Sequence, residues 1–88
     1  MLFRSFLSVL PEFRTSLERH LAQHDLEQIH RLGHRFKSST MTVGATGLAY
    51  LCKKLEKETE YEKLEKIASS INQATYFLEK NLQASINL

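Results

Sequence analysis

The sequence predicts an all-α protein, an up-down antiparallel four-helix bundle in which residues 1–88 form one domain. Its 88 residues include three Gly, one Pro and no Trp and are rich in Leu, Glu and Lys, a composition typical of helical proteins. Apolar residues recur every three or four positions in four segments, and no useful length alternates as a β-strand would. Short connections between the segments favour antiparallel neighbours. A chain of this length buries one small core, which argues against a large catalytic cleft with its own nucleotide pocket.

The first helix is expected over residues 2–22. Its apolar stripe consists of Phe6, Leu10, Phe13, Leu17 and Leu21. Pro11 either kinks this helix or marks a restart at the first helical position. The first ten residues resemble a signal peptide faintly, but they lack a cleavage site and continue in helical register, so a core helix is the better interpretation. No run approaches the roughly 20 apolar residues that cross a bilayer, which predicts no direct membrane insertion.

The second helix is expected over residues 25–42, with Asp25 as its N-cap and Gln28 as the reciprocal partner in a capping box. Its core-facing stripe consists of Ile29, Leu32, Phe36, Thr40 and Val43. The opposite face carries His30, His34, Lys37, Ser38 and Met41. His34 points almost directly away from the apolar stripe. The sequence therefore predicts an accessible imidazole with a free nitrogen rather than a core histidine.

Two more helices complete the predicted bundle. Gly44 and Gly47 mark the turn before a third helix whose apolar stripe is Leu48, Leu51, Cys52 and Leu55 and whose end carries Lys53, Lys54 and Lys57. Thr59 and Glu62 predict a capping box for the fourth helix. The fourth stripe consists of Leu64, Ile67, Ala68, Ile71, Ala74, Leu78 and Leu82. The single cysteine, Cys52, excludes an internal disulfide, fits a reducing cytoplasm and is expected to be a buried small hydrophobe.

The stretch around His34 resembles the signature of the histidine-containing phosphotransfer (HPt) domain. The matching residues are His34, Phe36, Lys37, Ser39, Gly44 and Ala45, followed by Leu48, Leu51, Cys52, Leu55 and Glu56. Two positions depart from the commonest pattern, since Ser38 stands where Gly is usual and Gly33 stands where Ala is usual. Both residues are small, so the approach of a partner stays open. The resemblance covers residues 26–56, and the helical pattern outside them is compatible with the family.

The resemblance implies that His34 accepts a phosphoryl group from a receiver-domain aspartate and passes it to another receiver domain. Lys37, one turn further on, can reach the phosphoryl oxygens. Partners would be receiver domains of response regulators or hybrid sensor kinases, which bring Mg²⁺ and much of the catalytic apparatus, so the chain itself needs no cofactor. The protein would be a cytoplasmic carrier rather than an enzyme, and a monomer. The expected partner-binding residues are His30, Arg31, Gly33, Arg35, Ser38 and Met41.

Charge is unevenly distributed along the chain, whose net charge is only +2. Residues 28–55 contain Arg31, Arg35, Lys37, Lys53 and Lys54 and no carboxylate, whereas residues 56–65 contain five glutamates. A positive field around the histidine would attract a phosphoryl group and an acidic partner pocket. The basic patch around His34 has no aromatic interleaving and no glycine-rich phosphate loop, so a protein partner is favoured over nucleic acid or free nucleotide.

Two other functions fit the residues. His20 with His24, and His30 with His34, have the i, i+4 spacing that lets two imidazoles share a metal ion on a helix. Neither pair has a cysteine or carboxylate near enough in sequence to complete a site, and a helix start separates the pairs. A plain adaptor bundle that binds a partner helix without chemistry is the second alternative.

Overall fold

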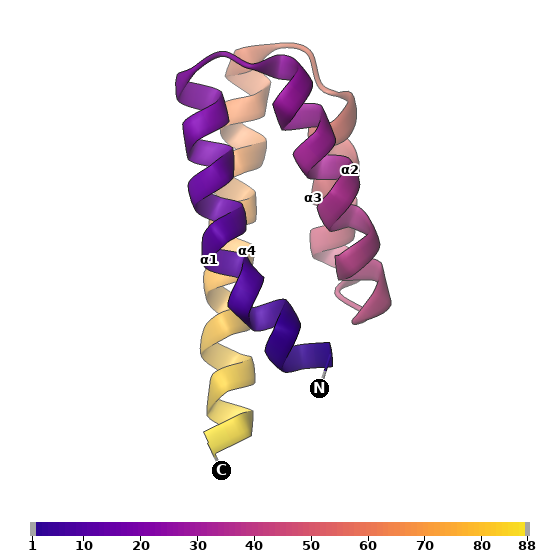
Figure 1. Ribbon diagram of the computed structural model, residues 1–88, viewed down its shortest axis with the longest axis vertical. Coiled ribbons are helices and arrows are strands. Elements are labelled where there is room, and N and C mark those ends of the chain that lie inside the picture. The colour runs from indigo at the N-terminus through magenta and orange to yellow at the C-terminus, as the bar shows by residue number, and fades with distance from the viewer. Residues whose placement is uncertain (1, 88) are drawn as a thin grey trace.

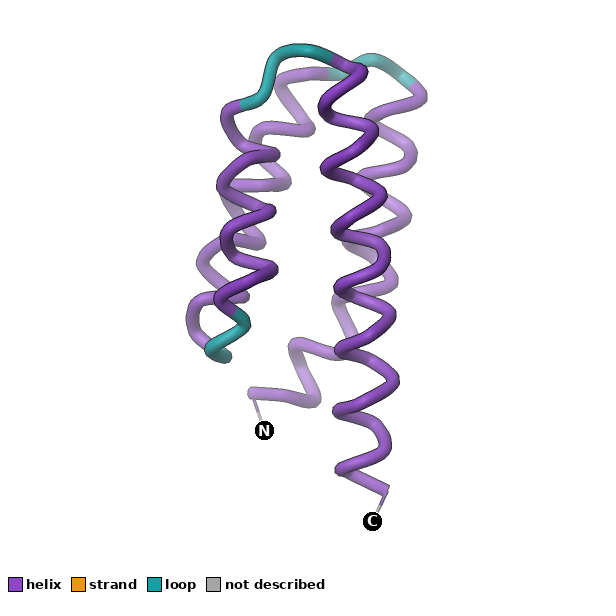
Figure 2. Tube along the Cα trace, turned by 180° about the vertical axis from the view of Figure 1, so that it is seen from behind, coloured by secondary structure: helices purple, strands orange, loops and turns teal. Residues whose placement is uncertain are grey.

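The computed structural model is a bundle of four helices joined by short connections, and it describes the backbone of residues 2–87 and the side chains of residues 6–81. The helices are α1 (Leu2–Ala22), α2 (Leu26–Thr42), α3 (Thr46–Lys57) and α4 (Tyr61–Asn87). Successive helices run in opposite directions (Figure 1). The described residues contain no strand, as the trace coloured by secondary structure also shows (Figure 2). The predicted all-α, up-down four-helix bundle is confirmed.

The helices form a closed ring in which each one packs against two neighbours. Within the described residues α1 contacts α2 and α4, and α3 contacts α2 and α4, with the most extensive contact between α2 and α3. The four apolar stripes meet in one core, whose fully buried side chains include Leu10, Phe13, Leu17, Ile29, Leu55, Leu64 and Ile71. The rings of Phe13 and Phe36 stack with centroids 4.1 Å apart, which joins α1 to α2. Leu82, the last residue of the predicted fourth stripe, lies outside the described side chains.

Pro11 lies inside α1, which continues through it. A proline removes one backbone donor and its ring crowds the preceding turn, so a bend is expected there. The N-terminal part of α1 turns away from the line of the rest of the helix (Figure 1). The structure therefore agrees with the kink rather than with a restart at the first helical position.

The predicted helix boundaries hold in part. Asp25 caps α2, since its carboxylate accepts a hydrogen bond from the backbone N–H of Gln28 at 3.3 Å. The reciprocal half of the predicted capping box is wrong, because the backbone N–H of Asp25 donates to the carbonyl oxygen of His20. The capping box predicted for Thr59 and Glu62 is wrong, because α4 starts at Tyr61 and the carboxylate of Glu58 accepts the backbone N–H groups of Thr59 and Glu60 instead.

The turn before α3 needs only one of its two glycines. Gly44 has a φ of +80°, a backbone conformation that strongly favours glycine. Gly47 lies inside α3, which begins at Thr46, so its predicted place in the turn is wrong. An added Cβ at Gly47 would meet nothing within 4 Å. The turn therefore ends before Gly47, and the third helix begins earlier than the two glycines suggest.

Candidate functional site

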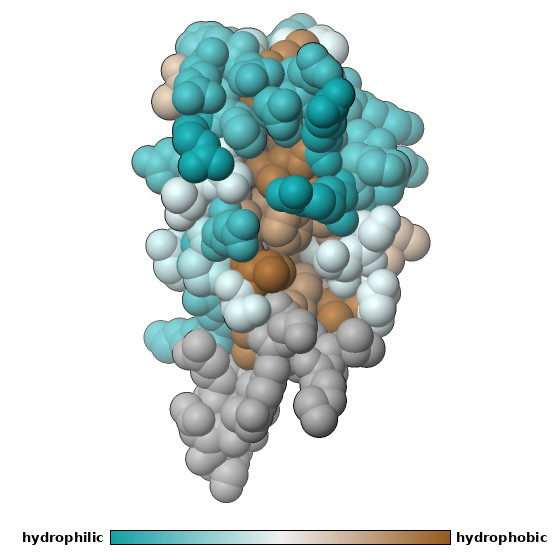
Figure 3. All heavy atoms as spheres, viewed as in Figure 1, coloured by the Kyte–Doolittle hydropathy of each residue, from teal (hydrophilic) through white to brown (hydrophobic). Residues whose placement is uncertain are grey.

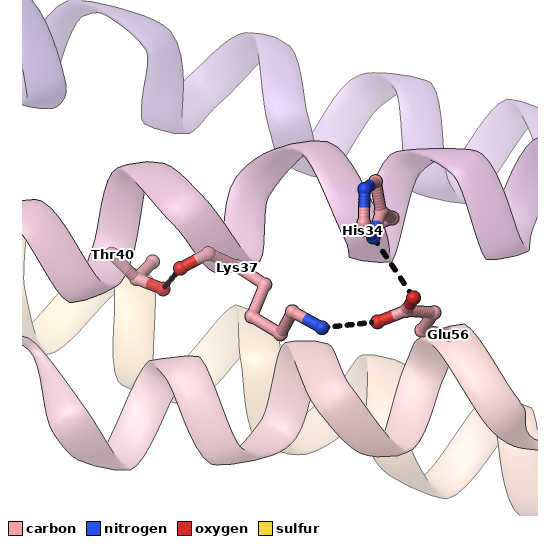
Figure 4. Close-up of polar contacts among 4 residues, drawn as sticks. All are labelled: His34, Lys37, Thr40 and Glu56. Atoms are coloured by element: carbon pink, nitrogen blue, oxygen red, sulfur yellow. Dashed lines mark hydrogen bonds and ion pairs between the residues drawn. The ribbon is translucent and has the colours of Figure 1, made fainter.

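His34 projects from the middle of α2 into solvent, as its position opposite the apolar stripe predicts. Its side chain is 66 % exposed. One ring nitrogen, Nδ1, lies 2.9 Å from Oε1 of Glu56, a residue of the neighbouring helix α3 (Figure 4). The imidazole is therefore accessible to solvent, and its hydrogen bond to Glu56 fixes its orientation.

The hydrogen bond to Glu56 decides which ring nitrogen of His34 can react. A carboxylate accepts hydrogen bonds, so Nδ1 carries the proton that is donated to Oε1. In the neutral ring the lone pair then belongs to Nε2, which points away from Glu56 (Figure 4). Among the described residues, none hydrogen-bonds to Nε2. The arrangement presents Nε2 to solvent as a nucleophile, and Glu56 of α3 sets the tautomer of the ring.

Lys37 shares the same carboxylate. Its Nζ lies 2.8 Å from Oε2 of Glu56, and both side chains are about a quarter exposed. Glu56 thus bridges His34 and Lys37 with its two oxygens (Figure 4). The hydrogen bond from Lys37, followed by the one from His34, holds the pKa of the Glu56 carboxyl below its usual range. The carboxylate is therefore ionised at neutral pH, and Lys37 stays within one side-chain length of the imidazole.

Gly33 brings α2 and α3 close enough for this bridge. A Cβ built on Gly33 would lie 2.9 Å from the carbonyl oxygen of Cys52 and 2.9 Å from the backbone nitrogen of Glu56. Both atoms belong to the α3 backbone, which cannot give way as a flexible side chain does. Gly33 is buried against α3, and its assignment to partner binding stays a prediction. Its absent side chain sets the distance between the histidine and the carboxylate.

His30 is also turned toward α3 rather than toward a partner. Its Nε2 lies 2.6 Å from the backbone carbonyl oxygen of Glu58, so this nitrogen carries a proton and donates it. The side chain is half-buried. His30 therefore ties the end of α3 to α2, and its place at the rim of a docking surface stays a prediction.

The remaining predicted partner residues surround His34 on its exposed side. Met41 is 63 % exposed, which is unusual for a large apolar side chain, and Ser38 is exposed beside it. Arg31 is exposed and pairs with Glu27 at 2.8 Å, one turn earlier in α2. Arg35 is exposed, with its guanidinium 5.5 Å from the centroid of the Phe36 ring. The structure brings these residues together on one face of α2.

The two arginines also border a groove between α1 and α2. One hollow of about 300 Å³ in this groove is lined by His20, Gln28, Arg31, Leu32 and Arg35, and a second of about 270 Å³ by Val9, Glu12, Arg35, Phe36 and Ser39. Figure 3 shows apolar atoms along the groove with hydrophilic side chains on both sides of it. The groove adjoins the histidine face, so a docked partner can contact both.

The charge pattern read from the sequence needs one correction. Glu56, the first residue of the acidic stretch, does not lie apart from the basic one but directly between His34 and Lys37. Sequence reasoning noted Glu56 only as part of the Leu55-Glu56 match and missed its role. Its distance of 22 residues from His34 hides the contact, which appears only when the two helices pack.

The histidine pairs and Cys52 are the other candidates for chemistry in the sequence. The described residues contain no group of three or more His, Cys, Asp or Glu side chains placed to hold a metal ion. His24 lies against the ring of Tyr61, with the ring centroids 4.5 Å apart. Cys52 is buried as predicted, and burial raises the pKa of its thiol to about 12, so it is not an activated nucleophile.

The fold and the site together define a class of protein: a small helical bundle that presents one oriented histidine at its surface. Comparison with protein families agrees, since the model of the Hpt domain matches residues 1–86. The chain belongs to the Hpt domain family, whose members are phosphocarriers in the histidine phosphotransfer of phosphorelays. Neither curated proteins nor solved structures gave a match to the chain. In the described part of the chain, no helix is long and apolar enough to span a membrane.

The lowered pKa of Glu56 predicts acid sensitivity of the fold. The folded protein binds this proton more weakly than the unfolded chain, so the contribution of Glu56 is present above the ordinary glutamate pKa of about 4.3 and is lost as pH falls below it. Glu56→Gln is expected to flatten the loss of Tm between about pH 5 and pH 3. Glu65→Gln, which changes an exposed carboxylate of α4, is the matched control and should keep the wild-type slope. Equal slopes in all three proteins would contradict the bridge.

Proposed function

We propose that this protein carries a phosphoryl group between receiver domains on Nε2 of His34. The observation that carries the proposal is the oriented imidazole, whose Nδ1–H is donated to Glu56 while Nε2 faces solvent. The lone pair of Nε2 attacks the phosphorus of a receiver aspartyl phosphate in line with the aspartate oxygen. The new N–P bond forms as the P–O bond breaks, and the aspartate leaves as a carboxylate. The reverse step on another receiver returns the imidazole to its resting state.

The bridge formed by Glu56 supports both directions of this transfer. Nδ1 keeps its proton throughout, so the phosphorylated ring bears a positive charge that the ionised carboxylate at 2.9 Å stabilises. Because Nδ1 keeps its proton, the imidazole leaves as a neutral ring when the phosphoryl group is passed on, and Glu56 offsets the positive charge until then. Lys37, 2.8 Å from the other carboxylate oxygen, can turn toward the equatorial phosphoryl oxygens once these carry negative charge.

The partner supplies the rest of the chemistry in this proposal. The receiver domain brings Mg²⁺ together with the aspartate, and the bundle contributes the nucleophile, the positioning carboxylate and a docking face. We assign that face to Arg31, Ser38 and Met41, which lie around His34, with Arg35 at its edge. An exposed methionine gives an adaptable apolar contact, and arginines favour an acidic receiver surface. The chain is thus a carrier rather than an autonomous enzyme.

The test is transfer from phosphorylated receiver domains. The protein is incubated with a panel of receivers charged with acetyl phosphate and Mg²⁺, and its intact mass is measured after each reaction. We expect a mass increase of one phosphoryl group that survives base and is lost in acid, as a phosphoramidate requires. Acid-stable phosphate would place the group on another residue type. Binding of a receiver without any transfer in either direction would favour the adaptor function.

A further inference from the structure

A second concave surface lies between α3 and α4, away from the three-residue bridge. It is a cleft of about 480 Å³ formed by the second half of α3 and the beginning of α4, two helices that lie side by side (Figure 2). Its lining residues are Tyr50, Lys53, Lys54, Lys57, Glu58, Lys63, Lys66 and Ile67. We refer to it as the lysine cleft. It includes none of His34, Lys37 and Glu56, so the proposed phosphotransfer does not account for it.

The lysine cleft has a large uncompensated positive charge. Five lysines line it against a single carboxylate, and the Glu58 carboxylate is engaged with the backbone N–H groups of Thr59 and Glu60. Lys63 has a carboxylate partner, Glu60, at 3.6 Å on the protein surface. Within the part of the chain with described side chains, the other four lysines form no ion pair. Like charges repel across the cleft, so a bound anion would relieve repulsion that the free protein carries.

The wall of the lysine cleft is aromatic and apolar. Tyr50 is 59 % exposed, and Nζ of Lys54 lies 4.9 Å from the centroid of its ring. The side chain of Ile67 contributes from α4. An exposed aromatic ring beside several ammonium groups offers a flat face for stacking together with charges for an anion. A solvated charged surface alone would not need this concave apolar wall.

We propose that the lysine cleft binds a compact anion that carries several phosphate groups, and that the exposed Tyr50 ring favours a nucleoside polyphosphate. The volume is that of a small-molecule site. Both walls are helices whose backbone groups are bonded internally, so an extended peptide would find no main-chain partners. Lysines bind phosphate as point charges and need no glycine-rich loop. The sequence does not reveal such a site, because its lysines are divided between two helices.

The experiment titrates the full chain with ATP and with tripolyphosphate at low salt, by calorimetry and by thermal shift. We expect both ligands to bind and to raise Tm, because they bind the folded state. The test variant is Lys53→Gln with Lys66→Gln, which leaves Lys54 and Lys57 to stabilise the end of α3. It is expected to weaken both ligands about tenfold. The control is Arg19→Gln with Lys80→Gln, which removes the same charge from exposed positions outside the cleft and should bind as wild type.

The two phosphate sources are separated by Tyr50→Leu. Stacking predicts that this variant binds ATP about tenfold more weakly and tripolyphosphate unchanged. Equal affinity of wild type and Tyr50→Leu for ATP would overturn the nucleoside part and leave inorganic polyphosphate as the ligand. Absence of binding, or equal weakening by the control pair, would overturn the site itself. None of these outcomes depends on His34, so the result is independent of the proposed phosphotransfer.

Discussion

His34→Gln is expected to abolish phosphoryl transfer from every receiver domain that phosphorylates the wild-type protein. Glutamine keeps a side-chain N–H that can donate to Glu56, although its nitrogen lies one bond further from the backbone than Nδ1 does. It has no nucleophilic nitrogen lone pair, so no N–P bond can form. The mass of the variant should therefore stay unchanged while its fold and its receiver binding persist. Intact mass spectrometry after incubation with phosphorylated receivers measures the loss.

His30→Gln is the matched control for that experiment. It changes the same residue type one turn earlier on α2, and His30 is half-buried with Nε2 donating to the carbonyl oxygen of Glu58. This nitrogen has no lone pair to offer, so the control should be phosphorylated as wild type is. Phosphate on His34→Gln but not on His30→Gln would show that the structure identifies the wrong histidine. Equal phosphorylation of both variants would place the acceptor elsewhere.

The order and faces of the helices could be predicted from the sequence because both depend on local patterns. Apolar residues at helical spacing give the four stripes, and the short connections require antiparallel neighbours. The exposure of His34 follows from the same periodicity. On a helix, His34 projects from the face opposite the core residues Leu32 and Phe36. These inferences need no knowledge of how two helices meet, and the structure agrees with them.

Contacts between residues of different helices could not be predicted from these local patterns. Glu56 reaches His34 only because α2 and α3 pack closely, and a stripe pattern fixes the buried face of each helix but not their separation or axial register. The separation of α2 and α3 depends on Gly33. In the sequence, this small residue suggests only that the surface beside His34 is open to a partner. Its burial against α3 shows a packing role for the missing side chain that the sequence does not reveal. The lysine cleft could not be predicted for the same reason, because its lysines come from two separate helices.

Gly33→Ala is expected both to destabilise the fold and to slow phosphotransfer. The new Cβ would meet two backbone atoms of α3 at 2.9 Å, so the helices must separate. Overpacking of this kind costs about 1–3 kcal/mol, against a gain in helix propensity of about 1 kcal/mol. We expect a net loss of up to about 2 kcal/mol in the free energy of unfolding, measured by urea denaturation. The same shift moves Glu56 away from His34, and transfer should slow by about tenfold.

Gly47→Ala separates this packing effect from the general effect of replacing glycine. Gly47 also lies in a helix, but its added Cβ would meet nothing within 4 Å. The control should therefore be as stable as wild type or gain up to about 1 kcal/mol from helix propensity, with an unchanged transfer rate. A Gly33→Ala protein that matches this control would contradict the close α2 and α3 packing. Loss of stability without slower transfer would show that the position of Glu56 does not limit the reaction, and slower transfer in both variants would exclude packing as the cause.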